Sequence, residues 1–368
     1  MKFIKLFLIM IFFSAVSAAS NHGIYLKTNK GISDDISKVA TDIKAKLQGT
    51  DYKILFSGPV TSPDHIRQDE EDFCGFKAEL FVLSNEKYNS MLTSFGSKYL
   101  VAGFLRIGIY EDPSGVNVVI TDPETINRIV FNDLYENDKE DVYNQVIEKT
   151  KPFKDELISL LHAAAGGEKV STPMEPIRDD EDLAESSKDM FMMVGEMTFF
   201  NDEDQFPEIY EKKNKEGFDG IKKLRDQFLS NIKYFEPVED DMEYRWYPEK
   251  SDLLWKVISQ IESPKKDAIL LGLTRPRTEA ESFNIAGSSR EDDSNKCPGI
   301  DHVTAYPIEV LLIQEGDEIK VYTQREMFRM DMYFWDAGMS AFMDHMSMPG
   351  ILDESIKKAL LGKEYEED

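Results

Sequence analysis

The stretch LRIGIYEDPSGVNVVITDP, residues 105–123, decides the fold. Two apolar runs, residues 103–110 and 116–121, flank a short polar turn that contains Pro, Ser and Gly. This pattern predicts an antiparallel β-hairpin. Working outward, apolar spacing predicts further strands, a helix before the hairpin and a helix after it, over residues 23–28, 34–48, 52–60, 76–84 and 122–165. A run of strands with helices on both sides predicts a two-layer α+β domain.

A second hairpin later in the chain repeats this pattern. Residues 306–313 and 319–323 flank a turn that contains Gly, and residues 106–111 align with residues 309–314. Residues 53–56 align in the same way with residues 267–270. We therefore expect a tandem duplication. The expected parts are a signal peptide (1–19), a first α+β domain (20–165), an acidic linker (166–189), a helical or extended insertion (190–242) and a second α+β domain (243–365).

Within the second domain the apolar spacing predicts two kinds of element. Helices are expected over residues 251–261, 326–345 and 355–361. Short strands are expected over residues 244–247, 268–274 and 282–287, in addition to the hairpin.

Composition limits the partners and the location of the chain. The 368 residues include 69 Asp and Glu against 43 Lys and Arg, which gives a net charge of −26. Because neutralising the phosphates of a nucleic acid needs an excess of Lys and Arg, we expect no nucleic-acid partner. Lys2 and Lys5 precede a short apolar run and a small-residue segment at 14–20, as in a secretory signal peptide. We expect a periplasmic or secreted protein with no membrane span in the mature chain.

The first domain resembles the bacterial family catalogued as domain of unknown function 302. The resemblance rests on residues 79–85, on residues 105–112 with the Gly115 turn, and on the Asp122-Pro123 pair. Glu86 stands where the family has Pro, and Gln324-Arg325 replaces Asp-Pro in the second domain. The resemblance implies two tandem β-α-β4-α two-layer domains, similar to the TATA-binding-protein fold class. Because the family has no agreed activity, it implies no catalytic residue.

Aromatic residues concentrate in the second domain. We expect them to lie between its sheet and its helices, where a small ligand could bind; a plain aromatic core is the alternative. The candidate ligand-binding residues are Trp255, Phe283, Tyr306, Phe328 and Trp335.

A methionine-rich segment with one histidine lies near the C-terminus. Thioether and imidazole groups are soft ligands that suit Cu(I). The candidate metal ligands are Met339, Met343, His345 and Met346. An apolar helix face packed on the sheet explains the same residues, so our main expectation is that the protein has no cofactor, with copper as the alternative.

The chain has two cysteines, Cys74 and Cys297, one in each expected domain. In an oxidising compartment they could form a disulfide between the domains, and two free thiols are the alternative. The main interpretation is an exported, non-enzymatic binding or accessory protein whose partner is a small ligand or a periplasmic protein. A periplasmic copper-handling protein is the runner-up, and a hydrolase or redox enzyme that uses Cys297 ranks last.

Overall fold

The computed structural model describes residues 21–184, 198–201, 205–237, 249–345 and 348–365. The expected signal peptide, the expected strand over residues 244–247 and Met346 lie outside these residues. The described chain is a mixed α+β structure with two antiparallel sheets. We call residues 22–184 the first unit and residues 205–365 the second unit.

The first unit is built on a six-stranded sheet in the order β2-β3-β4-β5-β1-β6. The long hairpin of the sequence forms two neighbouring strands of this sheet, with Asp112 opposite Gly115 at its turn. The strands are β1 (His22–Ile32), β2 (Tyr52–Pro59), β3 (Ala78–Asn85), β4 (Leu105–Asp112), β5 (Gly115–Thr121) and β6 (Glu168–Arg178).

Helices cover one face of this sheet. The side chain of Asp35 caps the first of them, and Val39, Ile43 and Leu47 form its buried stripe. Asn85 and Asp122 cap two further helices in the same way. The helices are α1 (Ile36–Leu47), α2 (Glu86–Ser94), α3 (Pro123–Val130), α4 (Asn132–Glu136), α5 (Glu140–Ala164) and α6 (Asp180–Ala184).

The second unit repeats this connectivity on a five-stranded sheet in the order β7-β11-β10-β9-β8. In both units a first strand and a helix precede four strands, and the first strand pairs with the last of those four. The strands are β7 (Glu208–Lys213), β8 (Lys256–Glu262), β9 (Ala268–Thr274), β10 (Ile308–Glu315) and β11 (Glu318–Thr323). The helices are α7 (Phe218–Lys233), α9 (Pro276–Ile285), α10 (Glu326–Phe334), α11 (Gly338–Asp344) and α12 (Met348–Leu361).

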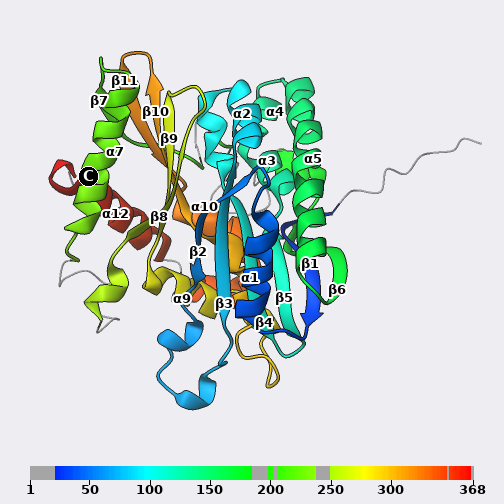
Figure 1. Ribbon diagram of the computed structural model, residues 1–368. Helices are drawn as coiled ribbons and strands as arrows, with labels where there is room; N and C mark the ends of the chain where they lie inside the picture. The colour runs from blue at the N-terminus through cyan, green and yellow to red at the C-terminus, as the bar shows by residue number, and fades with distance from the viewer. Residues whose placement is uncertain (1–20, 185–197, 202–204, 238–248, 346–347, 366–368) are drawn as a thin grey trace, which may run out of the picture.

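The two sheets face each other, and the long helices lie on the outer sides of the molecule (Figure 1). Each unit places a 3₁₀ segment on the sheet of the other: η3 (Ser97–Gly103) lies on β9 and β10, and η6 (Pro298–Ala305) lies on β3, β4 and β5. The approach is close, because a Cβ on Gly108 would come within 2.0 Å of a methyl carbon of Val303. The hydroxyl of Thr121 donates to the carbonyl of Thr304 at 2.8 Å.

A buried ion pair joins equivalent positions of the two units. Arg106 on β4 pairs with Glu309 on β10, and the two strands match in the alignment of the hairpins. Arg329 contacts the other carboxylate oxygen of Glu309 at 3.0 Å. All three side chains are buried, so the charges that join the units are desolvated and depend on one another.

Several sequence predictions about elements were wrong. Residues 251–261 form the 3₁₀ turn η4 (Lys250–Leu253) and strand β8 rather than a helix. An irregularity in the ladder between Val257 and Ser259 interrupts the strand alternation, and this produced the helical spacing. Residues 282–287 were predicted as a strand, but residues 282–285 complete α9, which Pro276 starts; Ala286 and Gly287 follow the helix, and Gly287 has a positive φ of 64°. The predicted helix over residues 326–345 is broken at Gly338, where φ is 87°.

The predicted linker and insertion contain elements of the two sheets. Within the predicted linker over residues 166–189, residues 168–178 form strand β6, whose polar sequence reflects its place at the edge of the first sheet. The predicted insertion over residues 190–242 contains β7 and α7, the first strand and helix of the second unit. Residues 53–56 belong to β2, whose place in the second sheet is taken by β8 and not by residues 267–270.

Candidate ligand pocket

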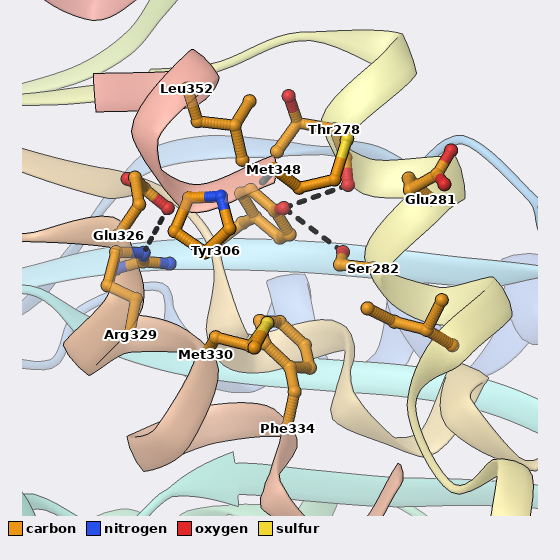
Figure 2. A pocket seen from close by; sticks show the side chains of 12 residues that line it. Thr278, Glu281, Ser282, Tyr306, Glu326, Arg329, Met330, Phe334, Met348 and Leu352 are labelled. Atoms are coloured by element: carbon orange, nitrogen blue, oxygen red, sulfur yellow. Dashed lines mark hydrogen bonds and ion pairs between the residues drawn. The ribbon is translucent and has the colours of Figure 1, made fainter. Parts of the chain in front are cut away.

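A pocket in the second unit lies between α9, α10 and α12, beside Tyr306, which follows η6 (Figure 2). Its volume is about 50 Å³, which is room for a few water molecules or the end of a larger ligand. Half-buried side chains on its rim, those of Ile285, Met330 and Met348, show that it reaches the surface. Phe334 and Leu352 complete its apolar lining.

Tyr306 forms the floor of the pocket with its polar end already occupied. Its hydroxyl donates to the carbonyl of Thr278 at 3.0 Å and is 3.0 Å from the hydroxyl of Ser282. Burial raises the pKa of Tyr306 well above its usual value. The ring therefore acts as a neutral, fixed wall.

Glu326, the first residue of α10, brings a carboxyl group to the pocket. One oxygen lies 3.8 Å from Nε of Arg329, and the other, Oε1, is buried with no hydrogen-bond partner among the described residues. Burial raises the pKa of Glu326 to about 7, although the charge of Arg329 opposes this. A carboxyl group that is half ionised near neutral pH thus lines an apolar pocket.

A second carboxyl group, that of Glu281, lies at the opposite side of the pocket (Figure 2). It pairs with Arg277 at 2.9 Å and lies 3.5 Å from Nε2 of His345. Glu281 is therefore compensated by neighbouring cations, in contrast to Oε1 of Glu326.

Of the five predicted ligand-binding aromatics, Tyr306 lines this pocket. Phe283 packs edge-on against Tyr306, with ring centroids 5.8 Å apart. Trp255 donates to the hydroxyl of Ser355 on α12 at 3.1 Å, and neither residue lines the pocket. Phe328 packs on Phe199, and Trp335 is half-buried in η7 (Trp335–Ala337).

Sequence reasoning missed Glu326. An acidic residue in the first turn of a helix is normally explained by the helix dipole and by solvent, and only the packing of α12 over α10 buries it. Its signal in the sequence was weak: an acid directly before the apolar residues Met327 and Phe328.

Of the predicted metal ligands that the structure describes, Met339 and Met343 lie on α11 and His345 follows it. Met339 and Met343 are 60% and 52% exposed. Nδ1 of His345 donates to the carbonyl of Ala341 at 2.7 Å. The hydrogen bond with Glu281 is the main reason why the pKa of His345 is raised. Both ring nitrogens of His345 thus face protein groups, and the two thioethers face solvent.

The two cysteines form a disulfide with their Cα atoms 5.7 Å apart. Cys297 therefore offers no thiolate here. The bridge ties the loop between β2 and β3 to the second unit, and Asp64 holds that loop by accepting from the backbone N–H groups of Cys74 and Gly75 at 2.7 and 2.8 Å. Asp64 and the two sulfurs lie close together, but disulfide sulfurs are not thiolate ligands for a metal.

A charge cluster with a buried histidine at its centre lies where η6 meets the first unit. The ring of His302 sits between Asp301 and Asp336, 3.0 Å from the latter, and Arg290 lies 2.9 and 2.8 Å from the same two carboxylates. Burial lowers the pKa of His302, but the two carboxylates outweigh burial and raise it to about 9. The ring of Tyr25 on β1 packs on this imidazolium, with centroids 4.5 Å apart. The cluster is therefore part of the joint between the units.

No helix among the described residues is long and apolar enough to cross a membrane.

Comparisons with known proteins add little. No protein-family model matches the chain, and no curated protein matches it. Among solved structures, the chain is similar to the crystal structure of the uncharacterized conserved protein DUF302 from Bacillus stearothermophilus, with a TM-score of 0.30 and 8% sequence identity. The match covers 38% of this chain and 98% of that one.

Proposed function

We propose that this chain is an exported, non-enzymatic protein that binds a small ligand in the pocket between α9, α10 and α12. The observation that carries the proposal is the buried Oε1 of Glu326, which lacks a partner among the described residues and lines an apolar pocket open at its rim. A buried acceptor without a donor costs stability, and a ligand that supplies the donor recovers it.

The fold proposal behind this function is a tandem pair of β-α-β4-α units, similar to the TATA-binding-protein fold class. The shared strand order and the matching positions of α2 with α9 and of α3 with α10 support it. In such a pair, one unit can keep a filled core while the other acquires a binding pocket.

The test is a fragment screen on the purified chain, read by thermal shift and by native mass spectrometry. We expect small ligands to raise the melting temperature of the wild-type protein. Met330→Trp places a large ring at the rim of the pocket and should abolish these shifts. Ser340→Trp on the exposed part of α11 adds the same ring elsewhere and should leave them intact. Shifts that survive in Met330→Trp would place the site elsewhere.

Copper handling is a second candidate function. It rests on the exposed thioethers of Met339 and Met343, one helical turn apart on α11 and close in sequence to His345. Titration with Cu(I) against a chelator, on the wild type and on Met339→Leu/Met343→Leu, tests it. Equal copper retention by the two proteins would reject a site built on these methionines.

A further inference from the structure

The pocket offers an acceptor without a donor. Glu326 is buried, and its Oε1 has no hydrogen-bond partner among the residues that the structure describes. Buried carboxylates are normally paired, because an isolated charge in an apolar site is costly. What is missing at this position is a hydrogen-bond donor, and a positively charged one would compensate the carboxylate best.

Two cations act on the charge of Glu326, Arg275 and Arg329, and Arg329 is the one that lines the pocket. Arg329 directs one terminal nitrogen to Glu309 at 3.0 Å and to Gln324 at 3.2 Å, and the other to the carbonyl of Ala305 at 2.6 Å. Only its Nε approaches Glu326, at 3.8 Å, which is too long for a hydrogen bond. Glu309 in turn is shared with Arg106. The guanidinium groups are thus committed to the joint between the units.

The other side chains that line the pocket indicate what the uncharged part of the ligand is like. Phe334, Met330 and Leu352 present apolar surface to the pocket that Glu326 lines (Figure 2). The small volume of about 50 Å³ admits the end of an aliphatic chain and leaves the remainder at the half-buried rim. A short alkyl group that ends in a donor fits this combination of walls and acceptor.

We propose that the pocket takes the alkylammonium end of a primary amine, with Glu326 as its counter-ion; this rests on the proposed function of the pocket. An ammonium group brings three donors and the opposite charge. A carboxylate ligand would meet the unpaired oxygen of Glu326 with like charge. The net charge of −26 also favours the approach of cations to the protein.

The ligand takes the place of a proton. Without a ligand, the carboxyl group titrates near pH 7, because burial raises its pKa, Asp353 on α12 raises it further, and the charges of Arg329 and Arg275 only partly oppose this. An alkylammonium stays charged to about pH 10. Its binding needs the ionised carboxylate, so affinity should fall by about tenfold for each pH unit below 7.

The experiment measures binding of three probes of equal length to the full chain: n-butylamine, n-butanol and butyrate, by NMR titration at pH 8 and at pH 5. We expect n-butylamine to bind at least tenfold more tightly than the other two at pH 8, and about 100-fold more weakly at pH 5 than at pH 8. Glu326→Gln, which keeps the shape of the side chain, should weaken butylamine binding by about 10- to 100-fold and leave butanol binding unchanged. The control Glu354→Gln removes an acid from α12 outside the pocket and should have no effect.

Each outcome decides between the two proposals. Equal binding of amine and alcohol would overturn the amine assignment and leave a general ligand pocket. Binding of none of the probes, with no shifts in the fragment screen, would overturn both. If Glu326→Gln does not fold, the pH dependence of the wild type decides, since butylamine affinity that is the same at pH 5 and pH 8 contradicts a role for this carboxyl group.

Discussion

The space under the helices differs between the two units, although the strands around it follow the same order. In the first unit this space is filled. Tyr88 packs edge-on against Phe153 with centroids 5.2 Å apart, and its hydroxyl contacts Asn127, which donates to Thr150 at 2.7 Å. In the second unit the corresponding helices α9, α10 and α12 enclose the pocket with the unpaired oxygen of Glu326. One framework thus supports either a closed polar network or a binding site, and a few side chains make the difference.

The loops that connect the units differ as well. The loop between β2 and β3 reaches over the second unit, where Arg67 donates to Asn284 at 2.9 Å and to the carbonyl of Lys296 at 2.8 Å. The shorter turn between β8 and β9 reaches back to the first unit, where Asp267 accepts from Ser97 at 2.6 Å. The contacts are reciprocal, but only the first loop carries a disulfide.

The largest expected effect comes from breaking that disulfide. Cys74 and Cys297 are separated by 223 residues, and loop closure over so long a segment corresponds to about 5 kcal/mol of unfolding free energy. Cys74→Ser/Cys297→Ser should lower the free energy of unfolding in urea by about this amount. Reduction of the wild type should give the same loss, and reduction of the variant should give none. Equal urea midpoints for oxidised and reduced wild type would contradict the prediction.

The next effect concerns the ion pair at equivalent positions of the two units. Glu309→Ala leaves Arg106 and Arg329 buried without their shared partner, and should cost about 3–5 kcal/mol. Arg106→Met should cost less, because Glu309 keeps Arg329. Urea unfolding at pH 7 measures both variants. Equal losses of unfolding free energy would show that Arg329 does not compensate the charge of Glu309 when Arg106 is removed.

The His302 cluster should make the joint between the units sensitive to alkali. The pKa of His302 is raised to about 9 from its usual 6.5, so its contribution is fully present below pH 6.5 and is lost as pH rises through 9. The loss amounts to about 3 kcal/mol. The same cluster keeps Asp301 ionised in acid. Burial raises the pKa of Asp301, but His302 and Arg290 outweigh burial and hold that pKa well below its usual value.

Unfolding free energies between pH 7.5 and 9.5 measure this effect. In that range Glu326 and Asp331, whose pKa values burial raises to about 7, have already lost most of their protons. Buried tyrosines lower the stability of the protein only above about pH 10, where tyrosines in the unfolded chain begin to ionise. His302→Gln should flatten the pH profile of stability in this window. An unchanged slope in the variant would show that another group titrates there.

The last effect, no larger than that of His302, tests the difference between the filled space of the first unit and the open pocket of the second. Burial raises the pKa of Glu326, so ionisation costs folding free energy as pH rises from about 4.5 to 7. Glu326→Gln should therefore stabilise the empty protein by up to about 3 kcal/mol at pH 8 and by almost nothing at pH 4. Asn127→Ala in the first unit should instead destabilise by about 1–3 kcal/mol at both pH values, because Tyr88 and Thr150 lose a buried partner. Changes of the same sign in both units would contradict the contrast drawn between them.

The sequence predicted the parts of the fold whose local pattern agrees with their final surroundings. The two hairpins and α1 are of this kind, because their apolar residues repeat with one period and strong turn or cap residues bound them. Strand β6 was not predicted because its sequence, at the edge of the sheet, is polar. Strand β8 was not predicted because an irregularity breaks its alternation. For the site, aromatic density led to Tyr306. Glu326 could not be found in this way, since its burial depends on α12, which packs on α10 from a later part of the chain.

The reciprocal cover of the two sheets has a consequence for biosynthesis. Strands β4 and β5 are complete long before Val303 and Thr304, which cover them, have been translated. At about 5–20 residues per second, the open face of the first sheet waits on the order of tens of seconds for its cover. During this interval its row of apolar residues is a surface for a chaperone or for another nascent chain. Because the first unit is translated first, its apolar sheet face is exposed during synthesis until the second unit folds over it.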